Sequence, residues 1–221
     1  STTGIFYLEA RDYSTGVGQY TVSAATASSA FSIIVNFVGL SIYQHYFTEA
    51  AARWSEIIIG DLPDVFTRTR GLIDDLLIDA YVETIDGSGG ILGQAGPTAI
   101  RSHGLPYMGV MKFDIDDVSR MVNNGTFGSV VLHEMGHVLG LGGLWSHRGL
   151  ISPTDPYAYL GTNGVEKYDL LVPGTQTSVP LEPGTRLGTS RVHWSEEVFD
   201  TELMTGYAEN SPPMPISIVT I

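Results

Sequence analysis

HEMGHVLGLG, residues 133–142, is the most informative part of this chain. Side chains four residues apart on a helix project from the same face, with Cβ atoms roughly 5–6 Å apart. The imidazoles of His133 and His137 can therefore reach a single metal ion. Glu134 follows the first histidine, so its carboxylate can lie beside that ion without binding it. The pattern predicts two metal ligands and a general base on one turn of a helix.

The neighbouring residues indicate that this helix is buried rather than a polar surface helix. Apolar side chains cover most of its circumference: Val130, Val131, Leu132, Val138 and Leu139. Buried ionisable groups need partners, and a metal ion satisfies two imidazoles together. The pattern HExxH on a helix is typical of zinc hydrolases, in which the glutamate is the general base. The sequence therefore predicts zinc as the cofactor.

Glycines after the second histidine predict an abrupt end to the helix. Gly140 is three residues beyond His137, and Gly142 and Gly143 follow closely. Glycine is poor inside helices and favourable at the left-handed position that ends one. A sharp turn here lets a later segment bring a third ligand to the metal.

The third ligand is not found at the position that the short pattern HExxHxxGxxH predicts, because residue 143 is glycine. His45 and His103 precede the motif and are interpreted as surface or loop residues. His147 is close to the motif but has no helical spacing to the pair. His193 remains, within RVHWSEEVFDTELMTG.

The chain from Phe31 to Ile221 resembles the leishmanolysin family of metzincin metallopeptidases in five segments that occur in order. These segments are AARWSEIIIGDLPDV (51–65), IDGSGGILGQAGP (85–97), GVMKFDIDDV (109–118), HEMGHVLGLGGLW (133–145) and HWSEEVFDTELMTG (193–206). In that family an insertion precedes the third histidine, which is followed by a methionine turn beneath the zinc. The resemblance implies His193 as the third ligand, 193 − 137 = 56 residues after the second, and Met204 as the turn methionine.

The resemblance also implies a fold and a substrate site. The expected fold class is α+β, a metzincin-type catalytic domain in which a mixed twisted sheet and two long helices lie above an irregular C-terminal subdomain. The expected activity is that of a zinc-dependent endopeptidase. An exposed edge strand would pair with an extended protein or peptide substrate, and its residues are Ile91, Leu92, Gly93, Gln94 and Ala95. The alternative for this segment is a glycine-rich hairpin without substrate contact.

Two departures from the family carry information. Eukaryotic members are rich in cysteine, whereas this chain has none, which excludes disulfide bonds and a cysteine latency switch within it. Family members also continue past the methionine turn into a further helix. We therefore expect the C-terminal subdomain, 141–221, to be truncated at its end.

The rest of the chain divides at residues 25 and 140. Alternating aromatic and β-branched residues predict a β-hairpin in 1–25, either the remnant of a preceding domain or propeptide or extra strands of the catalytic domain. The N-terminal catalytic subdomain is expected at 26–140. It should contain strands at 31–38 and 76–85 and an amphipathic helix at 41–59 that Ser41 caps. Residues 146–192 have no periodicity that predicts a fold.

Acidic residues at two positions in the chain suggest a calcium site. Asp86 lies in DGSGG, and Asp114, Asp116 and Asp117 lie in FDIDD. The two segments look like the calcium loops of a related metzincin group, the matrixins, and calcium prefers several carboxylate and carbonyl oxygens. Solvated acidic loops are the alternative interpretation.

Composition restricts the partners. Asp and Glu total 24 against 11 Lys and Arg, a net charge of −13, which opposes nucleic-acid binding. No apolar run reaches the roughly 18 residues of a membrane span. With no signal peptide at Ser1, we expect a mature, secreted, monomeric protein.

Two alternative functions stay open. A non-proteolytic zinc-binding protein would close all four positions with protein ligands, typically including cysteine. A gluzincin-type peptidase would use a glutamate on a second helix, such as Glu166, as the third ligand. Tyr207, three residues after Met204, is interpreted as structural rather than as an oxyanion donor.

Overall fold

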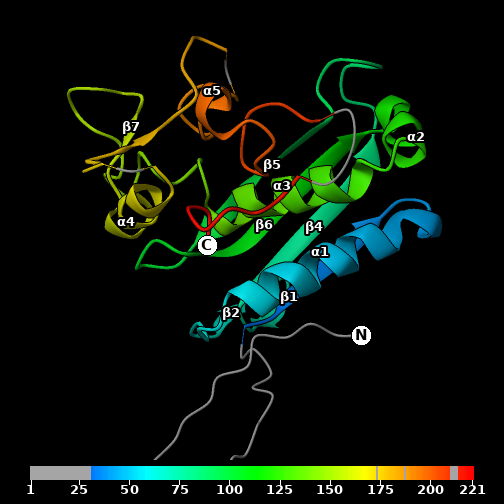
Figure 1. Cartoon of the computed structure of the whole chain (residues 1–221). Helices are drawn as coiled ribbons and strands as arrows, with labels where there is room; N and C mark the ends of the chain where they lie inside the picture. Colours follow the sequence, from blue (N-terminus) through cyan, green and yellow to red (C-terminus); the bar gives the residue numbers. More distant parts are fainter. Residues whose placement is uncertain (1–30, 173, 187, 210–213) are drawn as a thin grey trace, which may run out of the picture.

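A four-stranded mixed sheet is the base of the fold, with strand order β1-β4-β6-β5 (Figure 1). Its strands are β1 (Ile33–Val38), β4 (Leu76–Glu83), β5 (Gly93–Ile100) and β6 (Pro106–Asp114). β1, β4 and β6 are parallel, whereas β5 runs antiparallel to β6 and forms one edge. The mixed α+β class and the strands predicted at 31–38 and 76–85 are therefore confirmed.

The structure, a computed structural model, describes residues 31–172, 174–186, 188–209 and 214–221. The hairpin predicted for residues 1–25 lies outside the described residues. None of the helices in the described ranges is both long and apolar enough to cross a membrane.

The edge strand differs from its prediction at 91–95, because it begins at Gly93 and continues to Ile100. The backbone N–H of Ile91 donates to the Asp86 carboxylate, at 3.0 and 3.1 Å, and so belongs to the preceding loop. Pro97 is compatible with β5 because an edge strand has one row of backbone groups outside the ladder.

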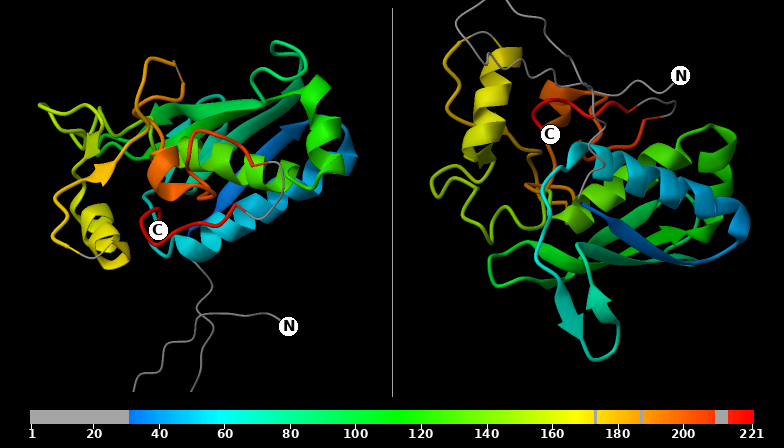
Figure 2. Two further views of the ribbon diagram at one scale, coloured as in Figure 1. Left: turned by 45° about the horizontal axis from the view of Figure 1, so that its top comes forward. Right: turned by 90° about the horizontal axis from the view of Figure 1, so that it is seen from below.

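Two long helices cover the same face of the sheet, α1 (Gln44–Ile57) and α3 (Phe127–Leu139) (Figures 1 and 2). Phe47, Phe113 and Phe127 meet between them and the sheet, edge to face, with ring centroids 5.4–6.2 Å apart. The indole N–H of Trp54 on α1 donates to the Leu132 carbonyl on α3 at 3.0 Å. This core fixes α3 against the sheet.

The start of the first helix corrects one prediction. A single 3₁₀ turn, η1 (Ser41–Tyr43), precedes α1, and no side chain caps either element. The tighter turn is closed by the bond from Tyr43 N–H to the Leu40 carbonyl, at 2.9 Å. Ser41 therefore lies inside the turn and cannot serve as the predicted cap.

Residues after Gly140 form short elements on the side of α3 away from the sheet (Figure 2). They are β7 (Ala158–Tyr159), α4 (Thr162–Leu171), β8 (Val179–Pro180) and α5 (Glu196–Phe199). Trp145, Tyr159 and Trp194 pack together with ring centroids 4.5–5.2 Å apart. An aromatic cluster thus organises the segment whose fold the sequence did not predict.

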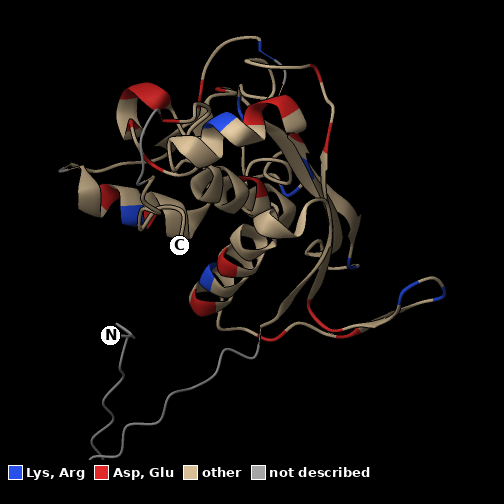
Figure 3. Ribbon diagram, turned by 90° about the vertical axis from the view of Figure 1, so that its right-hand side faces the viewer, with Lys and Arg blue, Asp and Glu red and all other residues tan. Residues whose placement is uncertain are grey.

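A small hairpin, β2 (Val65–Thr67) and β3 (Gly71–Ile73), projects from the body of the molecule (Figure 3). Its turn contains Arg68 and Arg70. The Arg70 guanidinium pairs with Asp79 on β4 at 2.6 Å, which ties the hairpin to the sheet.

The loop before β5 is held by carboxylates from α2 (Ile115–Asn123) and its cap. Asp114 accepts the backbone N–H groups of Ile85, Asp86 and Gly87 at 2.7–2.9 Å. Asp117 accepts the N–H of Gly89 at 3.0 Å. These acidic groups already have backbone donors, so the arrangement gives the calcium hypothesis no support.

Asp114 is buried, and its ionisation depends on these amides. Burial raises its pKa, but four backbone N–H groups, including that of Asp116 at the start of α2, favour the carboxylate. The net effect lowers the pKa of Asp114 to about 2. The ionised form is the one that anchors the loop.

We predict that Asp114→Asn destabilises the protein at neutral pH and flattens its stability curve in acid. A folded-state pKa below the ordinary value stabilises the fold above about pH 4, and this stabilisation is lost as the pH falls towards 2. Thermal unfolding between pH 2 and 7 measures both effects. Asp61→Asn, at an exposed position, is the control. Parallel curves for wild type and Asp114→Asn would contradict the prediction.

Candidate metal centre

The end of α3 orients its second histidine. Gly140 has the left-handed conformation, with φ 106°, and the helix stops there as predicted. Gly140 N–H bonds to the His137 carbonyl and Leu141 N–H to the Gly136 carbonyl, each at 3.1 Å, which is the Schellman pattern. The turn carries the Leu141 carbonyl back to His137, whose Nδ1 lies 2.9 Å from it.

His193 is held by backbone bonds on both sides of its segment. Its carbonyl accepts the N–H of Glu182 at 3.0 Å, and the next residue, Trp194, donates to the Met204 carbonyl at 3.0 Å. His193 is 5% exposed. His193, 56 residues after His137 in the chain, is thereby fixed next to α3.

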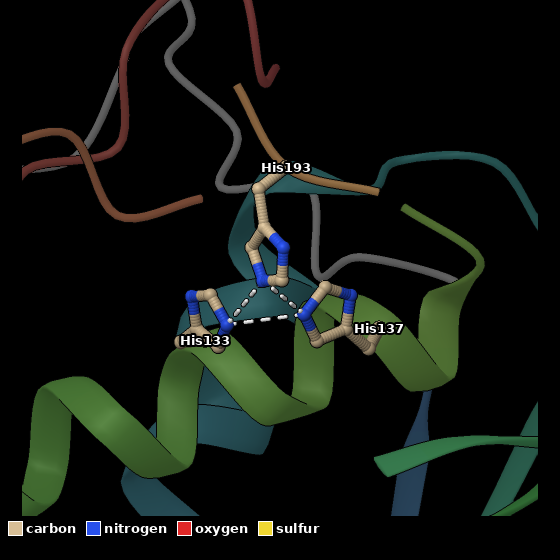
Figure 4. A group of neighbouring side chains, drawn as sticks. All are labelled: His133, His137 and His193. Carbon is tan, nitrogen blue, oxygen red and sulfur yellow. Dashed lines mark hydrogen bonds between the residues drawn. The ribbon is translucent and has the colours of Figure 1, made fainter. Parts of the chain in front are cut away.

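The three histidines meet at one point (Figure 4). The Nε2 atom of His137 lies 3.0 Å from that of His133 and 3.0 Å from that of His193. The third side of the triangle, between His193 and His133, is 3.2 Å. The three side chains offer their nitrogens as one group of candidate metal ligands.

The hydrogen bonds made by the Nδ1 atoms determine which nitrogen of each imidazole carries the proton. His133 Nδ1 lies 2.6 Å from the Leu203 carbonyl, and His193 Nδ1 lies 2.9 Å from the Thr189 carbonyl. Like the Leu141 carbonyl beside His137, these oxygens can only accept, so each neutral ring has its proton on Nδ1. The three Nε2 atoms then direct lone pairs at one another.

Protonation of the rings does not relieve this repulsion. Burial lowers the pKa of all three histidines, and the neighbouring rings lower it further for His133 and His193. For His193 the pKa falls to about 3. Converging neutral imidazoles could hold a cation through these lone pairs. Zinc–nitrogen bonds of about 2.0–2.1 Å in tetrahedral geometry separate the nitrogens by roughly 3.3 Å, so the observed triangle fits zinc closely.

Glu134 lies beside this triangle and beneath β5. It is 6% exposed, and burial raises the pKa of its carboxyl group to about 8. A Cβ atom on Gly93 would lie 2.9 Å from its Oε1 atom, so the glycine lets the edge strand pass directly over the carboxylate. A nearby cation would favour the ionised form.

Met204 is fully buried. Its sulfur would be 2.8 Å from a Cβ atom on Gly136, the residue immediately before His137. Gly136 therefore makes room for the Met204 side chain against α3. The role of Met204 as a turn methionine stays a prediction.

A cavity of about 700 Å³ contains the site. It is lined by the three histidines, Glu134 and all five predicted substrate residues, Ile91 to Ala95. Tyr207, interpreted above as structural, also lines the cavity and is 44% exposed.

The remaining histidines and the alternative glutamate lie elsewhere. His45, His103 and His147 are exposed, and none of them lines the cavity. Glu166 is exposed on α4 and does not line the cavity either. The structure thus brings His193, and none of these four residues, to the HExxH helix.

The carbonyl acceptors of the three rings could not be found from the sequence. Leu141, Thr189 and Leu203 contribute through their backbones, and a backbone carbonyl has no signature in residue type. The only sequence signal was the glycine that turns the chain after His137.

Comparison with models of known protein families gives no match for this chain, and comparison with proteins of curated function gives no significant match.

We predict that Gly142→Ala weakens zinc binding by about 10- to 100-fold, in the range of changes to groups that orient metal ligands. Gly142 has φ 73°, and a Cβ atom there would collide with the Val192 carbonyl, next to His193. Gly143→Ala is the matched control, because its Cβ atom would have no neighbour within 4 Å. Competition with a chelator measures both affinities; equal affinities would contradict the prediction.

Proposed function

We propose that the protein is a zinc-dependent endopeptidase of the metzincin class, similar to the leishmanolysin family. The observation that carries the proposal is the convergence of three Nε2 lone pairs beside an otherwise uncommitted glutamate. Among the described residues, none makes an observed hydrogen bond to the Glu134 carboxylate, and Glu134 lines the cavity. A structural zinc site would have four protein ligands, whereas three ligands and a free carboxylate are typical of a catalytic one.

His133, His137 and His193 would hold the zinc ion through Nε2. The bound ion supplies Lewis acidity and lowers the pKa of a water molecule towards about 7. The three carbonyl bonds at Nδ1 keep the rings in the tautomer that presents these lone pairs and increase their basicity. The histidines thus need no rearrangement to receive the metal.

Glu134 is the general base and then the general acid. Its carboxylate takes the proton of the attacking water and returns it to the amine that leaves when the peptide bond breaks. Burial keeps the Glu134 side chain in one place beneath β5 and shields it from bulk solvent. A group whose pKa lies close to neutrality exchanges a proton in both directions at low cost.

The substrates are proteins or peptides bound in extended form. β5 is an edge of the sheet, and the residues from Ile91 to Ala95 line the cavity beside the metal ligands. A peptide that pairs with the free edge of this strand lays its backbone across Glu134 and the histidines. The glycines of this segment leave room for that close approach.

We predict that Glu134→Gln abolishes peptide hydrolysis, with a loss of at least about 10²–10⁴-fold in kcat, while zinc remains bound. The amide has nearly the same shape but cannot accept the proton. Hydrolysis of a casein-derived peptide mixture and the zinc content of the purified variant are measured together. A variant that loses its zinc would contradict the role of Glu134 as a base alone.

The third ligand is tested by His193→Ala, which should sharply weaken zinc binding and abolish hydrolysis with it. His147→Ala is the control, since that side chain is exposed and outside the cavity. Zinc affinity measured by chelator competition distinguishes the two variants. If wild-type protein bound zinc tightly without cleaving any peptide, the non-proteolytic alternative would replace the proposal.

A further inference from the structure

We propose that Glu202 is a positioning residue that couples the C-terminal segment of the chain, residues 214–221, to the metal centre. The proposal rests on the three-histidine site described above and adds a residue that does not touch the metal. Glu202 is 4% exposed and lies between the His193 segment and Met204 in the sequence.

Both oxygens of the Glu202 carboxylate are fully engaged. Oε2 accepts the backbone N–H of Met204 at 2.5 Å. Oε1 accepts the N–H and the hydroxyl of Ser217, each at 3.0 Å, and the hydroxyl of Thr220 at 2.6 Å. Four donors around one buried carboxylate stabilise its charge, and they come from two segments that are otherwise irregular.

One branch of this network leads to His133. Glu202 fixes the turn at Leu203 and Met204, and the Leu203 carbonyl is the acceptor for His133 Nδ1. The Leu203 N–H, in the preceding peptide, donates to the Pro215 carbonyl at 2.8 Å, so the same residue is held from the C-terminal segment as well. The orientation of the first metal ligand therefore depends on Glu202 through a single residue.

A second branch leads towards His193. The Thr220 hydroxyl, which donates to Glu202, also accepts the indole N–H of Trp194 at 2.8 Å. Trp194 follows His193 and is 2% exposed. The C-terminal segment thus bonds to Leu203, whose carbonyl orients His133, and to Trp194, which follows His193 in the chain.

Replacement of Glu202 by glutamine tests this coupling with little change in size. The amide NH₂ cannot accept the donors that now face the carboxylate, so at least one buried donor loses its partner. The expected consequence is a shift of the Leu203 carbonyl and of the His133 ring, rather than the loss of a ligand. Changes in groups that orient ligands lower metal affinity by about 10- to 100-fold.

The experiment uses the full chain loaded with Co²⁺, whose paramagnetism shifts the ring N–H signals of bound histidines in proton NMR spectra. Wild type should give three solvent-exchangeable signals, one for each Nδ1–H. Glu202→Gln should move or broaden one of them, assigned to His133 by selective labelling, and weaken Co²⁺ binding. Circular dichroism establishes that the variant is folded. Glu197→Gln, at an exposed position on α5, is the matched control.

If Glu202→Gln does not fold, Thr220→Val keeps the side-chain volume but removes one donor to the carboxylate and the acceptor of the Trp194 indole N–H. It should lower Co²⁺ affinity while all three signals persist. Three unchanged signals with unchanged affinity in the folded variant would overturn the inference and leave the proposed function standing. Fewer than three exchangeable signals in wild type would instead overturn the three-histidine site, and the inference with it.

Discussion

Three hydrogen bonds from imidazole Nδ1 atoms to backbone carbonyls are the constraint on which this site depends. They place the proton of each ring on the outer nitrogen, so that the inner nitrogens face one another as lone pairs 3.0–3.2 Å apart. Burial opposes ring protonation, so the protein cannot relieve the repulsion by itself. The arrangement therefore offers a cation three ready ligands.

Glycines determine how closely other parts of the chain approach that centre. Gly93 allows β5 to cross Glu134, and Gly136 admits the Met204 side chain beneath the helix. Gly142 lets the backbone at Val192 pass next to the turn that ends α3. At each of these three contacts a Cβ atom would collide with its neighbour. Glycine therefore lets the sheet, α3 and the C-terminal part of the chain pack directly against one another. The Glu134 carboxylate, the His137 turn and the Met204 side chain are packed by these contacts.

The C-terminal part has little regular secondary structure and is held in other ways. Trp145, Tyr159 and Trp194 supply an aromatic core, and the buried Glu202 carboxylate gathers donors from the end of the chain. These interactions fix the positions of carbonyl groups, which irregular backbone would otherwise leave variable. The part of the chain after Gly140 thus supplies the carbonyl groups that orient all three rings.

The sequence by itself determined the HExxH helix, its end at Gly140 and the strands at 31–38 and 76–85. These follow from local rules, namely side-chain spacing on a helix, glycine conformation and strand propensity. His193 and Met204 were reached only through a family resemblance, because no spacing rule connects residues 56 positions apart. The tertiary structure decided the start of β5, the acceptors of the three rings and the role of the acidic loop residues as amide acceptors. Those features depend on backbone groups brought together from distant segments, and residue types do not encode where such groups meet.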